Sequence, residues 1–351
     1  MTRPIRLMVV DDSMVARAVL SRMIEADGHF DIVGVAGTAE DAIVALAHVE
    51  VDIVLLDLEM PGVGGLKSIP RILEAAPGAR VMVVSSVAED GAEETVAALA
   101  LGAADTLPKP GTGRFNGRFS EVLIARLLAL GRAERGVRGP RASFATAAES
   151  HHKLRTMSAE PLTLLALGAS TGGIHALGTL LAALPPAIGV PILVTQHLPP
   201  AFMTVFARQL GVVAKRPAVV AEDGMKLTPD MLFIAPGDAH LTVSEERGER
   251  LVRLVHFPAA SGCMPSVDPM LASVGAVAGR RGLGIVLTGM GRDGVEGAAK
   301  MVACGGSVLA QDEASSAVWG MPRAIAEAGL AAAVLPPDQL ARRVISRIGE
   351  H

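Results

Sequence analysis

Short hydrophobic runs alternate with helix-like segments along the first 110 residues of the chain. The runs lie at 6–10, 32–36, 53–56 and 81–85, with a weaker one at 105–107. The segments between them place apolar residues at helical spacing, for example 14–26 and 39–49, where Thr38 stands at the N-cap position of the second. Strands that alternate with helices at this spacing predict a parallel sheet with crossover helices. Five such units fit the length of this first domain.

The alternation stops after this domain and then resumes. Residues 119–130 carry apolar side chains at helical spacing and predict the last helix of the first domain. Residues 131–160 are rich in Gly, Arg, Ser and Ala without sustained apolar periodicity, which is typical of a linker. We therefore expect a domain at 1–130, a linker at 131–160 and a second domain at 161–351.

The second domain shows the same alternation with one addition. Candidate strands lie at 162–167, 190–195, 231–235, 285–287 and 307–310. Two further segments, 240–244 and 250–256, flank the charged turn EERGER and predict an antiparallel hairpin attached to a mostly parallel sheet. The predicted fold class is therefore α/β. It comprises a five-stranded parallel (βα)5 domain, a linker, and a doubly wound, mostly parallel α/β domain with an antiparallel hairpin.

Composition removes several classes of function. Half of the 351 residues are hydrophobic and 19% are charged, which argues for folded domains. Eight Phe, one Trp and no Tyr do not suit a protein that stacks single-stranded nucleic acid on aromatic side chains. The net charge of -4 is the sum of -9 over residues 1–110, +5 over 111–160 and zero over 161–351, so no domain is strongly basic. We expect no nucleic-acid partner.

The N-terminal sequence, the length of the apolar runs and the number of cysteines indicate the expected cellular compartment. The N-terminal sequence has no signal-peptide pattern, and no apolar run approaches the ~18 residues of a spanning helix. Cys263 and Cys304 are too few for a disulfide framework or an all-cysteine zinc site. We therefore expect a cytoplasmic protein without membrane insertion, in which both cysteines are small buried hydrophobic residues.

Carboxylates follow two predicted strands of the first domain. Asp11 and Asp12 come directly after the run that ends at residue 10, and Asp57 comes after the run that ends at residue 56. The carboxyl ends of parallel strands share one edge of a sheet, so these three side chains are expected to meet there. Three close negative charges need a compensating cation, and Mg²⁺ suits an all-oxygen site. Alternatively, each acid only begins a turn or caps a helix, as Asp12 or Ser13 could for the helix at 14–26.

Other polar residues follow the fourth and fifth predicted strands. Ser85 and Ser86 offer hydroxyl groups after the fourth strand, and Lys109 could reach the same edge from the fifth. Polar residues at successive strand ends are harder to explain as independent caps than any one of them alone.

These residues stand in motifs that resemble one known family. DDS at 11–13, DLEMP at 57–61, SS at 85–86 and KP at 109–110 together resemble the response-regulator receiver domain, over residues 5–130. The resemblance implies that Asp57 is the phosphoacceptor and that Asp11, Asp12 and Asp57 hold Mg²⁺ for its phosphorylation. It also implies that Lys109 contacts the phosphoryl group and that Ser85 is the switch hydroxyl.

Three residue types that can cooperate in acyl transfer follow strands of the second domain. Ser170 lies in a Gly-rich turn whose G-x-S-x-G pattern resembles a nucleophile elbow, although a plain tight turn is the alternative. His197 follows the next strand and could take and return the serine proton, or only cap a loop. Asp293 lies in TGMGRDG after the strand at 285–287 and could orient the imidazole, or cap the next helix.

The motifs around these residues resemble a second family. GASTGG at 168–173, QH at 196–197, IAPGD at 234–238, PSVD at 265–268, LTGMGRDG at 287–294 and AQDE at 310–313 together resemble the catalytic domain of the chemotaxis methylesterases, over roughly 161–345. The resemblance implies Ser170 as nucleophile, His197 as general base and Asp293 as its orienting group. It also implies an oxyanion site around backbone groups of Thr171 and Met290.

The two resemblances together imply a phosphorylation-controlled esterase. The implied reaction is hydrolysis of glutamate methyl esters on methyl-accepting chemoreceptors with release of methanol, together with deamidation of receptor glutamines, in bacterial chemotaxis. A chemotaxis histidine kinase is the implied phosphodonor, and ester hydrolysis itself needs no cofactor. We expect a receiver docked over the carboxyl edge of the catalytic sheet to block the substrate, and phosphorylation of Asp57 to loosen it.

Two other classes of protein remain as alternatives. A receiver-controlled transcription factor would need a basic helix-turn-helix domain after the linker, whereas residues 161–351 are neutral and alternate strands with helices. A receiver fused to a nucleotide-binding or scaffold domain without catalysis would not need Ser170, His197 and Asp293 together.

Overall fold

The computed structural model describes residues 3–85, 89–110, 117–132 and 153–349. The chain divides into two compact units, residues 1–140 and 141–351. The predicted boundaries at 130 and 161 stay a prediction, because residues 133–152 lie outside the described part. Within the described ranges no helix combines the length and the apolar character needed to cross a membrane.

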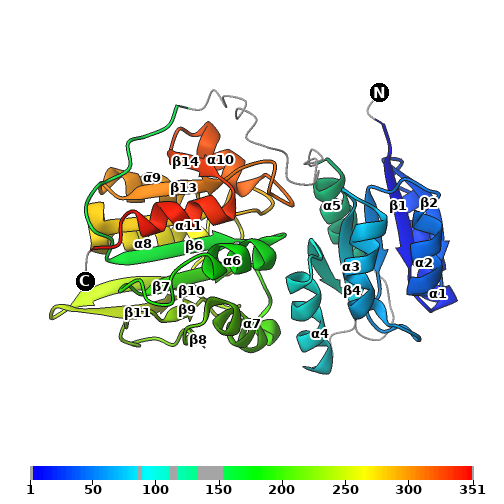
Figure 1. The fold of residues 1–351 in the computed structure, drawn as a ribbon, viewed down its shortest axis with the longest axis horizontal. Helices are drawn as coiled ribbons and strands as arrows, with labels where there is room; N and C mark the ends of the chain where they lie inside the picture. Colours follow the sequence, from blue (N-terminus) through cyan, green and yellow to red (C-terminus); the bar gives the residue numbers. More distant parts are fainter. Residues whose placement is uncertain (1–2, 86–88, 111–116, 133–152, 350–351) are drawn as a thin grey trace. The chain divides into compact units, whose positions relative to one another are not determined.

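A five-stranded parallel sheet with the order β2-β1-β3-β4-β5 forms the first unit (Figure 1). Its strands are β1 (Ile5–Val10), β2 (Phe30–Ala36), β3 (Ile53–Leu56), β4 (Arg80–Ser85) and β5 (Asp105–Pro108). All five predicted runs are confirmed as strands. The sheet is nearly buried at β1, β3 and β4 because helices cover both faces, which explains why these strands have continuous hydrophobic sequences.

The first unit's helices are α1 (Met14–Glu25), α2 (Ala39–Leu46), α3 (Gly65–Ala75), α4 (Glu89–Ala100) and α5 (Gly117–Arg132). Helices α2, α3 and α4 pack in one row, and α1 packs beside α5. Ser13, not Asp12, caps α1, since its hydroxyl accepts the N–H of Ala16. The carboxylate of Asp12 is therefore not used as the helix cap.

The second unit is built on a seven-stranded sheet in which every neighbouring pair is parallel. The strand order is β14-β13-β12-β6-β7-β9-β8. The strands are β6 (Leu164–Ala169), β7 (Ile192–Gln196), β8 (Ala218–Val220), β9 (Leu232–Ile234), β12 (Gly282–Val286), β13 (Ser307–Gln311) and β14 (Ala331–Leu335). Strands β8 and β14 were not among the predicted strands.

The antiparallel hairpin is present but stands apart from the main sheet. Strands β10 (His240–Glu246) and β11 (Glu249–Val255) form a two-stranded sheet of their own, and β10 packs against α8 (Val267–Ala278). Leu251 of β11 also makes an isolated antiparallel bridge to Lys226. The expected attachment of the hairpin to the main sheet is thus corrected, and the main sheet is parallel throughout. Apolar residues of the hairpin, including Leu241 and Val252, join the core that Met270, Leu271 and Met301 form.

Helices lie on both faces of the second sheet. One row contains α6 (Gly173–Ala182), α7 (Pro200–Ala214) and α11 (Pro337–Ile345), while α8 packs beside α9 (Val295–Ala303), which contacts α10 (Met321–Glu327). A short 3-10 helix, η2 (Gly279–Arg281), leads from α8 into β12. The chain builds β7 to β9 on one side of β6 and then β12 to β14 on the other. Ligands bind at such a reversal in parallel α/β sheets, outside the carboxyl ends of the strands.

Candidate active site

The predicted carboxylate cluster of the first unit is present at the ends of β1 and β3. One oxygen each from Asp11, Asp12 and Asp57 lies within 4.8 Å of the other two. Lys109, just after β5, donates hydrogen bonds from Nζ to Asp11 Oδ2 at 2.9 Å and to Asp57 Oδ2 at 2.7 Å. The three carboxylates form an oxygen donor set that suits a hard cation such as Mg²⁺.

Burial shapes the acidity of this cluster. Burial raises the pKa of Asp57 above its ordinary value, and the contact with Lys109 opposes this only in part. Burial lowers the pKa of Lys109, but its hydrogen bonds to Asp57 and Asp11 outweigh burial and leave that pKa raised. The lysine is therefore a fixed cation between the two acids.

The serines after β4 were both predicted at this edge. Ser85 is buried, its hydroxyl lies 2.9 Å from that of Thr95, and its carbonyl accepts the N–H of Lys109 at 2.8 Å. Ser85 and Lys109 are thus adjacent through the backbone. Ser86 lies outside the described residues.

In the second unit, backbone hydrogen bonds between neighbouring segments bring Ser170 and His197 to the same edge of the sheet. The N–H of His197 donates to the carbonyl of Ala169 at 3.1 Å, so the pairing of β6 with β7 continues past the strands. On the other side, the N–H of Ser170 donates to the carbonyl of Thr288 at 3.0 Å. Ser170 therefore lies between the chain segments that follow β7 and β12.

The turn after Ser170 needs its glycines. Gly172 has a φ of +75° and precedes α6 as its N-cap, and an added Cβ would lie 2.4 Å from the Cβ of Ala317. A Cβ on Gly173 would lie 2.2 Å from Oε1 of Gln196, whose Nε2 donates to the carbonyl of Ser170 at 2.8 Å. The sharp turn thus places Ser170 at the N-terminus of a helix, where the helix dipole favours negative charge.

His197 and Asp293 form the central contact of the site. His197 Nε2 lies 2.8 Å from Asp293 Oδ2, and the Asp293 side chain is only 1% exposed. Asp293 also accepts the Ser266 hydroxyl on Oδ1 at 2.6 Å and the N–H of Val267 on Oδ2 at 2.7 Å. The side chain therefore contacts the N-terminus of α8, and not that of α9 as the alternative interpretation supposed.

The electrostatics of this pair follow from burial and hydrogen bonding. Burial lowers the pKa of His197, but the contacts with Asp293 and Cys263 outweigh it and raise that pKa to about 9. Burial raises the pKa of Asp293, but the hydrogen bond from His197 and those from Ser266 and Val267 hold it well below its ordinary value. Asp293 is thus an anion that stabilises a positive charge on the imidazole.

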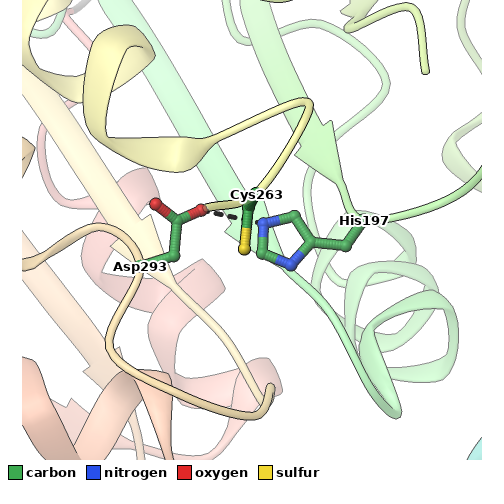
Figure 2. A group of neighbouring side chains, drawn as sticks. All are labelled: His197, Cys263 and Asp293. Carbon is green, nitrogen blue, oxygen red and sulfur yellow. Dashed lines mark hydrogen bonds and ion pairs between the residues drawn. The ribbon is translucent and has the colours of Figure 1, made fainter. Parts of the chain in front are cut away.

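A third titratable side chain lies at this pair. Cys263, in the loop between β11 and α8, offers its Sγ within 4.8 Å of the ligand atoms of His197 and Asp293 (Figure 2). The expectation of two buried cysteines is wrong: Cys263 is half-buried and Cys304 is exposed. Residues so far apart in the sequence meet because Asp293, after β12, binds the N–H of Val267, the first residue of α8, which follows the loop that contains Cys263.

Sequence reasoning did not assign the groups that hold Asp293. Ser266 caps α8, and its N–H donates to Nδ1 of the buried His240 at 2.9 Å. His240 Nε2 in turn donates to the carbonyl of Phe257 at 2.8 Å. Ser266 belongs to the PSVD motif at 265–268, so that motif was the available sequence signal, whereas nothing in the sequence linked His240 to Asp293.

The predicted oxyanion residues lie beside Ser170. The loop after β12 approaches so closely that a Cβ on Gly289 would lie 2.7 Å from the Ser170 Cβ. The peptide N–H of Met290, the next residue, donates no hydrogen bond within the described part of the chain. The carbonyl of Thr171 lies 2.9 Å from the Thr288 hydroxyl, which fixes the turn after the serine.

The hydroxyl of Ser170 stands apart from the hydrogen bond between His197 and Asp293. Among the described residues no hydrogen bond joins it to His197, so the structure brings His197 and Asp293 into contact and Ser170 into their neighbourhood. Catalytic hydrogen bonds often form only when substrate is bound.

Comparison with known proteins agrees with both halves of the chain. The family model described as "CheB methylesterase" matches residues 165–344, and the one described as "Response regulator receiver domain" matches residues 7–114. The chain is 39% identical to a protein-glutamate methylesterase/protein-glutamine glutaminase 1 of Paramagnetospirillum magneticum, covering 97% of this chain and 95% of the relative. It is 40% identical to a protein-glutamate methylesterase/protein-glutamine glutaminase 2 of Caulobacter vibrioides, covering 97% and 98%.

A solved structure matches the second unit. The crystal structure of the Thermotoga maritima CheB methylesterase catalytic domain aligns with a TM-score of 0.51 and 34% identity, over 52% of this chain and 97% of that chain. With the strand-end residues, the two matched domains and relatives that cover nearly its whole length, the chain belongs to the CheB methylesterase family, in the form that carries a receiver domain.

Proposed function

We propose that this protein hydrolyses glutamate methyl esters on chemoreceptors with release of methanol, and that phosphorylation of Asp57 controls the reaction. The hydrogen bond between His197 and Asp293, beside Ser170 at the reversal of strand order, is the observation that carries the proposal. Membership of the family supports the reaction type, since the curated relatives are named for this esterase and for glutaminase activity.

Ser170 is the nucleophile in this proposal. With Nε2 of His197 committed to Asp293, Nδ1 is the ring nitrogen left to accept the Ser170 proton. The serine oxygen attacks the ester carbonyl, and the carbonyl oxygen becomes an oxyanion. Peptide N–H groups of Thr171 and Met290 hold this oxyanion, each donor supplying about 3–4 kcal/mol of transition-state stabilisation.

The tetrahedral intermediate then collapses. The C–O bond to the methoxy group breaks, and the imidazolium of His197 returns its proton so that methanol leaves. Water, deprotonated by the same imidazole, attacks the acyl-enzyme and releases a glutamate side chain and free Ser170. With glutamine as substrate the leaving group is ammonia, and the same residues carry out deamidation.

The receiver carries the control. Asp57 attacks a phosphoryl group supplied by a chemotaxis histidine kinase, and Lys109 and Ser85 are the groups we expect to contact the transferred phosphoryl oxygens. Mg²⁺ held by Asp11, Asp12 and Asp57 would offset the negative charge of the reacting groups. The acyl phosphate carries a charge of about -2 in place of the single negative charge of the Asp57 carboxylate.

Methanol release from methylated chemoreceptor membranes tests the proposal. Wild type and Ser170→Ala would each be assayed with and without a small phosphodonor and Mg²⁺. We expect release that requires Ser170 and rises with the phosphodonor.

The other outcomes separate the two parts of the proposal. Release that depends on Ser170 but ignores the phosphodonor would retain the esterase and reject Asp57 as its switch. No release from wild type under any condition would reject the esterase.

A further inference from the structure

The mechanism above leaves one reactive side chain at the catalytic pair without a role. The donor atoms of His197, Cys263 and Asp293 all lie within 4.8 Å of one another (Figure 2). They come from three separate loops, after β7, between β11 and α8, and between β12 and α9. A ring nitrogen, a thiol sulfur and a carboxylate oxygen therefore point to one spot.

These three donors are typical of a borderline-soft divalent ion. Zn²⁺ takes imidazole nitrogen, cysteine sulfur and carboxylate oxygen as ligands, and non-structural zinc sites have three protein ligands with a fourth position left open. The receiver cluster differs in kind, because Asp11, Asp12 and Asp57 offer oxygen alone. Thiolate ligands select zinc over magnesium, so the two clusters of this chain are suited to different ions.

Little movement is needed to admit the ion. His197 Nε2 and Asp293 Oδ2 are 2.8 Å apart, whereas two tetrahedral zinc ligands at about 2.0–2.1 Å from the metal are about 3.3 Å apart. The ion would replace the proton that the two atoms share, and the ring would carry its proton on Nδ1 instead. Cys263 can adjust to it, because the hydrogen bond from its thiol to the carbonyl of Ser261 is long, at 3.8 Å. A Cβ added to Gly262, the residue before it, would have nothing within 4 Å.

Two hydrogen bonds already hold the Asp293 carboxylate in position. Ser266 and the N–H of Val267 hydrogen-bond to Asp293 on Oδ1 and Oδ2, and neither contact needs to break when Oδ2 also binds a metal. Such outer contacts orient ligands in protein metal sites and strengthen binding.

We propose that His197, Cys263 and Asp293 form a zinc-binding site that blocks the esterase when it is filled. A metal on the Nε2 lone pair leaves the proton of the neutral ring on Nδ1, so the serine proton has no acceptor. The metal also removes the Asp293 contact that supports a positive charge on the imidazole. Binding at this site stands on the side-chain cluster alone, whereas the block of activity rests on the proposed function.

The test uses the full chain, kept reduced and in excess Mg²⁺, with Co²⁺ and Zn²⁺ as probes. Co²⁺ reports a bound thiolate by a sulfur-to-cobalt charge-transfer band, which Zn²⁺ then displaces. We expect this band in wild type and in Cys304→Ser, which removes the exposed second cysteine, and its loss in Cys263→Ser. Removing a ligand should weaken Zn²⁺ affinity by more than about 10-fold, since losing outer partners alone costs 10–100-fold.

Methanol release is measured in parallel. Zn²⁺ should inhibit wild type and Cys304→Ser at concentrations that leave Cys263→Ser active, and a chelator should restore the rate. A band that survives in Cys263→Ser, equal Zn²⁺ affinity in the two cysteine variants, or binding that only Asp57→Asn abolishes would overturn the site. A thiolate band in a protein that releases no methanol would keep the site and reject the esterase.

Discussion

At the scale of single residues, the site depends on the environment of one imidazole. In the proposed mechanism His197 must be neutral to accept the Ser170 proton, while the contacts with Asp293 and Cys263 raise its pKa to about 9. Below that pH the ring is protonated and cannot act as a base. We therefore expect kcat/KM for methanol release to rise with pH and to reach half its maximum well above the ordinary histidine value of 6.5.

The Asp293→Asn variant is the control for this pH profile. It removes the contact that raises the pKa of His197, so its midpoint should move to lower pH while its maximal rate falls. Blanks without enzyme correct for hydrolysis of the ester by base. A wild-type midpoint at or below 6.5 would contradict the argument.

Which site residues could be predicted from the sequence depended on where they lie. Ser170, His197 and Asp57 directly follow strands, and strand ends of a parallel sheet meet at a known edge, so their placement was accessible. Cys263 and His240 come from the hairpin region, whose path over the sheet is fixed only by tertiary packing. The expected burial of Cys263 was wrong because composition says nothing about a loop that borders an active site.

At the scale of elements, the N-terminus of α8 holds the Asp293 carboxylate in place as well as beginning a helix. The hydroxyl of Ser266 caps this helix through the N–H of Asp268 and also donates to Asp293. We expect Ser266→Ala to lose about 1 kcal/mol or more of unfolding free energy and to lower kcat, because the carboxylate loses a hydrogen bond. Denaturant unfolding and methanol release measure the two effects.

Ser13→Ala is the matched control. It removes the cap of α1 in the receiver and should cost a similar unfolding free energy, but without any fall in unstimulated esterase activity. An equal loss of activity in both variants would mean that general destabilisation, and not the Asp293 contact, explains the effect.

The turn from β6 into α6 is the second element that can be tested. Gly172→Ala has two effects. It places a residue with a Cβ at a positive φ, which costs about 1–2 kcal/mol, and it brings that Cβ against the side chain of Ala317. We expect a lower melting temperature and a fall in kcat, since Ser170 is two residues away.

Gly248→Ala separates these two causes. Gly248, in the turn of the β10–β11 hairpin, has a φ of +81° and nothing within 4 Å of an added Cβ, so it suffers backbone strain alone. It should lose stability while kcat stays as in wild type. If Gly172→Ala also loses stability but keeps the wild-type kcat, close packing at the turn does not position Ser170.

The two strands that were not predicted, β8 and β14, were missed for related physical reasons. Strand β8 has three residues, too few for any periodicity, and β14 is built mostly of Ala, which is a poor strand former. Both lie at the edges of the seven-stranded sheet, where neighbouring strands rather than local preference determine the conformation. The hairpin was visible, but its separation from the main sheet was not, because sheet membership is a long-range property.

At the scale of the whole molecule, we propose that one carboxylate, Asp57, controls the chemistry of the other unit. We expect Asp57→Asn to abolish the rise in methanol release on addition of phosphodonor and Mg²⁺, with each variant compared with its own unstimulated rate. Ser13→Ala, with the phosphoacceptor intact, should still respond. A stimulated rate in Asp57→Asn would show that the phosphodonor acts elsewhere.

The reversal of strand order beside β6 has a consequence for synthesis. Ser170 and His197 belong to the half of the sheet made first, and Asp293 to the half made last. A chain still emerging from the ribosome therefore lacks Asp293, the carboxylate that contacts His197. Any proteolytic fragment that ends before β12 lacks it too. In the proposed mechanism, hydrolysis is therefore confined to complete chains. Two fragments divided between β9 and β12 should each be inactive and should regain activity only on reassembly.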